Sequence, residues 1–105
     1  MKGDENQMTR GKAVKKVPGG KLIRIEADYE EIVSDVKITG DFFLHPEECL
    51  IKIEQMLKGS RLPLDKPVLM NMIESLLIKE HADLIGVSAE DIISTLEEAV
   101  TCSSA

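Results

Sequence analysis

Side chains that could bind a metal ion or act as a nucleophile are sparse in this sequence, and the most suggestive pair is His45 and Cys49. Residues four positions apart share one face of a helix, as metal ligands sometimes do. A zinc site needs three or four protein ligands, and nothing near this pair supplies the others. A His at a helix start beside a buried Cys explains the pair better, and His81 fits a capping or surface residue near a helix end. The sequence therefore predicts no metal site and no catalytic group of its own.

A second candidate is the stretch Gly19-Gly20-Lys21, which could contact a phosphate. Two glycines can expose backbone N–H groups to an anion, and a lysine adds a positive charge. The stretch is not a P-loop, because Lys15 stands where that motif has its first Gly, and Leu22 stands where it has Ser or Thr. A turn at the start of a hairpin, with a solvated lysine, is the alternative interpretation.

A third candidate is the segment Ile38–Phe43, with the sequence ITGDFF, which holds both phenylalanines of the chain. Gly40 and Asp41 are typical of a strand end, and Gly40 permits a sharp bend or the close approach of another backbone segment. Phe42 and Phe43 could both fill the gap between sheet and helix, or one of them could face outward to contact a partner. The residues by themselves do not decide between these two arrangements.

Two strands are predicted ahead of this segment. Residues 21–30 and 32–38 alternate apolar and polar side chains, which indicates half-buried strands joined as an antiparallel hairpin. One face of the second strand would hold Ile32, Ser34, Val36 and Ile38.

Three helices are predicted after the strands. The first spans residues 45–59, the second is capped by Asp65, and the third starts at a capping box formed by Ser88 and Asp91. Two or three short strands followed by about three helices predict an α+β fold, in which helices cover one face of a small antiparallel sheet.

Length and charge limit what the chain can be. Its 105 residues suffice for one small domain. Residues 1–24 carry a net charge of +5, so the remainder carries −11 of the total of −6. An acidic body argues against nucleic-acid binding, and no apolar run approaches the ~20 residues of a membrane span. The basic N-terminal end could meet a local anion.

Domain boundaries and location follow from the same features. We expect a flexible basic arm over residues 1–16, a folded domain over 17–101 and a tail over 102–105. The N-terminus has no apolar central region of the kind a secretory signal needs, and the two cysteines have no motif spacing. We therefore expect a cytoplasmic protein with reduced thiols.

Residues 17–59 resemble the C-terminal accessory domain of lipoate–protein ligases. That family's pattern opens one strand with Gly-Lys-Leu, ends the next with Ile-Thr-Gly-Asp-Phe-Phe, and opens a helix with Pro-Glu-Glu that ends in Gly. This chain matches the pattern at Gly20–Leu22, Ile38–Phe43, Pro46–Glu48 and Gly59. Residues 17–101 are on this basis identified as an accessory domain of the lipoate–protein ligase type.

The resemblance implies a fold similar to the NifU and SufE scaffolds of iron–sulfur assembly, although the cysteine set of those proteins is missing. It implies a small accessory subunit that forms a heterodimer with a separate catalytic subunit. The pair would activate lipoate to lipoyl-adenylate with ATP, then transfer the lipoyl group to a lysine of an acceptor domain of 2-oxoacid dehydrogenases or the glycine cleavage system. ATP, Mg²⁺ and lipoate would bind in the complex, and this chain alone would bind no cofactor.

The resemblance also implies roles for the two unusual stretches. Gly19, Gly20 and Lys21 would lie near the nucleotide phosphates. Gly40, Asp41, Phe42 and Phe43 would contact the catalytic subunit. The alternative is a stand-alone interaction or regulatory module on the same α+β scaffold, without a role in catalysis. An adaptor would bind its partner without activating it, whereas a ligase subunit would change the partner's ATP-dependent activity.

Overall fold

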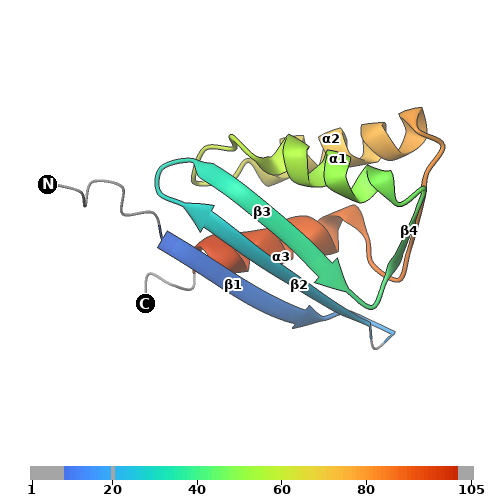
Figure 1. Ribbon diagram of the computed structural model, residues 1–105, viewed down its shortest axis with the longest axis horizontal. Helices are drawn as coiled ribbons and strands as arrows, with labels where there is room; N and C mark the ends of the chain where they lie inside the picture. The colour runs from blue at the N-terminus through green and yellow to red at the C-terminus, as the bar shows by residue number, and fades with distance from the viewer. Residues whose placement is uncertain (1–8, 20, 102–105) are drawn as a thin grey trace, which may run out of the picture.

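The computed structural model describes residues 9–19 and 21–101, which form an antiparallel sheet, a short two-stranded ribbon and three helices (Figure 1). The sheet has the strand order β1-β2-β3, formed by β1 (Thr9–Lys16), β2 (Leu22–Tyr29) and β3 (Val33–Gly40). The ribbon pairs β4 (Phe43–His45) with β5 (Asp83–Ile85), and the helices are α1 (Glu48–Leu57), α2 (Lys66–Lys79) and α3 (Ala89–Thr101). The predicted α+β fold with about three helices is confirmed.

The core lies between one face of the sheet and the helices. α3 packs against β1 and β2, α1 packs against β3, and α2 packs against α1 and α3. The alternation predicted for β2 is confirmed, because its residues Ile23, Ile25 and Ala27 are buried. The largest fully buried side chains come from the sheet and from all three helices: Ile23, Ile25, Ile38, Ile53, Leu57, Ile73, Ile92, Ile93 and Leu96.

β1 was not expected from the sequence. It pairs with β2 along its whole length, from Thr9 opposite Tyr29 to Lys16 opposite Leu22. The prediction of a flexible arm over residues 1–16 is therefore wrong for residues 9–16, while residues 1–8 lie outside the described part of the chain. The buried positions of β1 include Gly11, where a Cβ would collide with the Ala99 carbonyl oxygen of α3. A helix packed so closely on a strand needs small residues, which produce only a weak apolar alternation in the sequence.

β3 differs from its predicted pattern at the end nearest the hairpin turn. The register with β2 shifts between Asp28 and Tyr29, which is the mark of a β-bulge. The bulge turns Val33 into the core, whereas Ser34 is exposed and Ile32 is 44% exposed. The prediction of a shared buried face is thus correct for Val36 and Ile38. It is wrong for Ile32 and Ser34, because one extra residue in the strand inverts the alternation.

The predicted helix caps are confirmed. The Asp65 side chain accepts a hydrogen bond from the Val68 N–H at 3.4 Å. Ser88 and Asp91 form the reciprocal capping box, with N···O distances of 2.8 and 3.1 Å. The first helix is shorter than predicted: it spans Glu48–Leu57, and His45 belongs to β4 instead.

Cys49 and His81 lie where the sequence predicted, whereas His45 belongs to strand β4 and not to a helix start. His45 is exposed on β4 and Cys49 is fully buried in α1. His81 is exposed just after α2, with a left-handed backbone φ of 53°. Within residues 9–19 and 21–101, no group of three or more His, Cys, Asp or Glu side chains is placed to hold a metal ion. The helices of the same residues are too short or too polar to cross a membrane.

Candidate functional site

The two unusual stretches of the sequence meet at one end of the sheet. Gly40 is the partner of Ile23 in the β2–β3 register, and the Asp41 N–H donates to the Leu22 carbonyl oxygen at 2.9 Å. Lys21 directly precedes Leu22, so the β1–β2 turn and the Gly40–Phe43 segment are neighbours in space. Figure 1 shows this turn, the end of β3 and β4 at one end of the molecule, opposite the β2–β3 turn.

The turn before β2 has the features of an open, exposed loop. Gly19 has a left-handed φ of 99°, and a Cβ at this position would meet no atom within 4 Å. The Val17 N–H donates to the Lys21 carbonyl oxygen at 2.9 Å and closes the turn. The Lys21 side chain is exposed. Gly20 lies outside the described residues, so its predicted part in phosphate contact stays a prediction.

Two glycines at this end lie close to neighbouring segments. A Cβ at Gly40 would collide with the Leu22 carbonyl oxygen, as the predicted close approach requires. Gly86 follows β5, and a Cβ there would lie 3.3 Å from the Phe42 Cβ and 3.4 Å from the Lys21 Cγ. Lys21 and Phe42 therefore both lie beside Gly86. Gly86 was not predictable as part of the site, because its neighbours there are distant along the chain.

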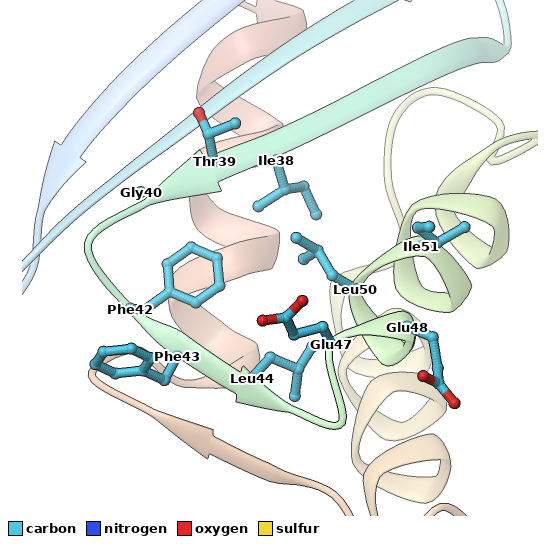
Figure 2. A pocket seen from close by; sticks show the side chains of 10 residues that line it. All are labelled: Ile38, Thr39, Gly40, Phe42, Phe43, Leu44, Glu47, Glu48, Leu50 and Ile51. Carbon is cyan, nitrogen blue, oxygen red and sulfur yellow. The ribbon is translucent and has the colours of Figure 1, made fainter.

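The two phenylalanines have different environments. Phe42 is partly buried and packs against the core. Phe43 is 70% exposed. In Figure 2 the Phe42 ring points toward Leu50 of α1, and the Phe43 ring points away from it. The structure thus favours the second arrangement considered from the sequence, in which one ring fills the gap between sheet and helix and the other faces outward.

Phe43 has an apolar neighbour across the ribbon. It pairs with Ile85, which is 59% exposed. Side chains of directly opposed residues lie on the same face of a strand pair. The next pair, Leu44 with Leu84, packs against the core instead. We call the exposed pair the Phe43–Ile85 patch. Ile85 was not predictable from the sequence, because a three-residue strand is too short to show its pairing partner.

A groove of about 750 Å³ opens beside this segment, between the end of β3, residues 42–44 and the start of α1. We call it the β3–α1 groove. Ile38, Phe42 and Leu50 are among its apolar lining residues, and Glu47 and Glu48 are its acidic ones. Figure 2 shows the Glu47 carboxylate pointing between Phe42 and Leu50, whereas the Glu48 carboxylate points away.

One hydrogen bond holds the two walls of the groove together. The Glu54 carboxylate of α1 accepts the Ile38 N–H of β3 at 2.8 Å, in a partly buried position. This N–H is on the open edge of the sheet, where a backbone donor would otherwise need water or another strand. The bond therefore adds to the side-chain packing that holds α1 beside β3.

Several exposed cations at this end of the molecule have no ion-pair partner among the described residues. Lys16, Lys21 and Arg24 are exposed near the β1–β2 turn and form no ion pair with any residue that the structure describes. Arg10, at the opposite end of β1, is by contrast 3.0 Å from a carboxylate oxygen of Asp28. Uncompensated cations attract anions or acidic surfaces. This end of the molecule thus presents an unpaired positive charge at Lys21 and an exposed apolar side chain at Phe43.

Fold and site together define a small α+β domain with a charged and apolar end that none of its described residues covers. No model of a known protein family matches the sequence. Over 76 residues the chain is 32% identical to lipoate-protein ligase A subunit 2 of Thermoplasma acidophilum, an alignment that spans 71% of this chain and 76% of that protein. The chain therefore belongs to the family of lipoate-protein ligase A subunit 2, as the resemblance of residues 17–59 predicted.

A solved structure agrees with this assignment. The fold is similar to a chain in the structure of an archaeal lipoylation system from Thermoplasma acidophilum, which comprises a bi-partite lipoate protein ligase and its E2 lipoyl domain. The TM-score is 0.61 at 29% identity, with 85% of this chain and 93% of that chain covered. The expected similarity to the NifU and SufE scaffolds is a separate matter and stays a prediction.

Proposed function

We propose that this chain is the small accessory subunit of a bipartite lipoate–protein ligase, required with a separate catalytic subunit for the ATP-dependent activation of lipoate to lipoyl-adenylate. One observation carries the proposal: in a member of the subunit 2 family, Lys21 lies beside Phe42 at an uncovered end that also exposes Phe43 and Ile85. An anion-binding group next to an apolar contact surface is what a subunit needs to dock beside a nucleotide site.

The chemistry would be divided between the two subunits. The catalytic subunit would bind ATP, Mg²⁺ and lipoate, and this chain would bind none of them alone. The heterodimer, in the cytoplasm, would transfer the lipoyl group to a lysine of an acceptor domain of 2-oxoacid dehydrogenases or the glycine cleavage system. This division is supported by the similar structure from Thermoplasma acidophilum, in which a bi-partite lipoate protein ligase is studied with its E2 lipoyl domain.

The contribution of this chain would be electrostatic and steric. Lys21 would neutralise phosphate charge while the adenylate forms, an effect that grows when the surrounding cleft excludes water. The Phe43–Ile85 patch would hold the subunit against its partner and help to exclude that water. Only activation handles a triphosphate. Transfer from ready-made lipoyl-adenylate would therefore need this chain less than activation does.

A lipoylation assay tests the proposal. The catalytic subunit is incubated with an apo acceptor domain, with and without this chain, starting either from ATP and lipoate or from synthetic lipoyl-adenylate. We expect the chain to be required for the first reaction and dispensable for the second. If the chain binds the catalytic subunit but alters neither reaction, the proposal is refuted and the chain is an interaction module without a catalytic role.

A further inference from the structure

The β3–α1 groove combines an apolar lining with a carboxylate that is free to bind a cation. Phe42 and Leu50 are half-buried, so a partner that covers them would remove apolar area from water. Glu47 stands at the N-cap of α1 but forms no capping hydrogen bond, and its carboxylate points between those two side chains (Figure 2). It forms no ion pair with any described residue of this chain.

We propose that the β3–α1 groove receives a segment of the catalytic subunit that carries an apolar side chain next to an arginine or lysine. The apolar side chain would lie between Phe42 and Leu50, and its cationic neighbour would pair with Glu47. Loss of one partner from a charge-assisted hydrogen bond that an interface shields from water costs more affinity than the same loss in an exposed pair. The inference rests on the proposed function, because it takes the catalytic subunit as the partner.

The charge of the groove argues against other occupants. The Glu47 carboxylate points into it and Glu48 is among its lining residues, and this negative charge repels nucleotide phosphates and the carboxylate of free lipoate. A second copy of this chain would bring a net charge of −6 to an acidic groove. A cationic segment of another protein complements the site in both charge and apolar character.

The groove would also orient the complex. The backbone end of Phe42 lies beside Gly86 and Lys21, and its ring faces the groove that contains Glu47. A partner that meets a cation on one side of Phe42 and an anion on the other is disfavoured in the reversed orientation by like-charge repulsion. Pairing at Glu47 would thereby select one binding orientation, in which Lys21 always faces the same part of the catalytic subunit.

The test is a charge reversal with a control matched for charge at the start of another helix. Glu47→Lys changes the groove, and Glu90→Lys makes the same change in the first turn of α3, where Glu90 is exposed and outside the groove. Affinity for the catalytic subunit is measured by calorimetry, and thermal unfolding shows that each variant is folded. We expect Glu47→Lys to raise Kd about tenfold or more and Glu90→Lys to change it less than about threefold.

A milder variant separates ion pairing from general disturbance of the fold. Glu47→Gln removes the charge and keeps the size, so the Kd of this variant should rise less steeply with NaCl than that of the natural chain, while Glu90→Gln should leave the salt dependence unchanged. If Glu47→Lys binds as tightly as Glu90→Lys, the groove proposal is refuted, even when the lipoylation assay supports the ligase function.

The remaining outcomes also decide the matter. Failure of the natural chain to bind the catalytic subunit would refute both proposals at once. The isolated chain could instead bind free lipoate saturably, or bind a second copy of itself. If Glu47→Lys abolishes either kind of binding, the groove has a different occupant and the proposal of a catalytic-subunit segment is refuted.

Discussion

Replacement of Phe43 by alanine should weaken binding to the catalytic subunit while leaving the stability of the fold almost unchanged. Phe43 is 70% exposed in the free chain, so its truncation removes little packing and should lower the free energy of unfolding by less than about 1 kcal/mol. A phenylalanine has roughly 150–250 Å² of surface, so about 140 Å² would remain for a partner to cover. At about 25 cal/mol per Å², full burial of that area contributes about 3.5 kcal/mol to binding.

Part of that area is retained by the alanine Cβ, so the expected loss of affinity is about 2–3 kcal/mol, or roughly a 30- to 150-fold rise in Kd. Calorimetric titration against the catalytic subunit measures Kd, and urea unfolding measures stability. Val68→Ala is the control, because Val68 is 50% exposed at the start of α2, away from the ribbon, and should leave Kd unchanged. A Phe43→Ala variant that binds within about threefold of the natural chain would refute the docking surface, since that change is within ~0.7 kcal/mol.

Three further predictions concern the site and its support. Lys21→Ala should slow lipoyl-adenylate formation by the complex about tenfold or more, without changing Kd between the subunits or transfer from lipoyl-adenylate. Gly40→Ala should lower the free energy of unfolding by about 3 kcal/mol in urea titrations, because the new Cβ collides with the Leu22 carbonyl oxygen. Glu54→Ala should lower it by about 1–3 kcal/mol, because the Ile38 N–H loses its acceptor.

Matched variants keep these predictions specific. Lys21→Arg retains the charge and should retain most of the rate, and an equal loss for both starting substrates in Lys21→Ala would contradict a role at the phosphates. Gly59→Ala isolates the backbone cost, because Gly59 also has a positive φ but open space around it, and about 1 kcal/mol is expected. Glu54→Gln keeps an acceptor oxygen and should cost less than Glu54→Ala. Equal losses of stability in Gly40→Ala and Gly59→Ala would contradict the predicted collision at Gly40. Equal losses in Glu54→Ala and Glu54→Gln would contradict the predicted role of the Glu54 hydrogen bond.

The parts of the fold that local signals specify were predictable. A capping box is complete within four residues, so Ser88 and Asp91 located the start of α3 without any tertiary information. Asp65 did the same for α2. The strand alternation in β2 was strong, because its buried positions carry large apolar side chains such as Ile23 and Ile25.

The parts that depend on contacts between distant segments were not predictable. β1 buries Gly11 and Ala13 under α3, and the need for such small residues is visible only once the helix is in place. The bulge that exposes Ile32 and buries Val33 is a property of strand pairing, which a single strand does not reveal. Ile85 and Glu47 belong to the site only because the ribbon and the groove bring them there.

By itself, the sequence determined the family and the unusual residue types: a Gly-Gly-Lys turn, both phenylalanines after a Gly-Asp pair, and an acidic helix start. The tertiary structure decided that Lys21 lies beside Phe42, that Phe43 rather than Phe42 faces outward, and that Glu47 points into a groove. The physical reason is that caps and side-chain alternation act over a few residues, whereas exposure and charge placement depend on which segments the sheet register and helix packing bring together.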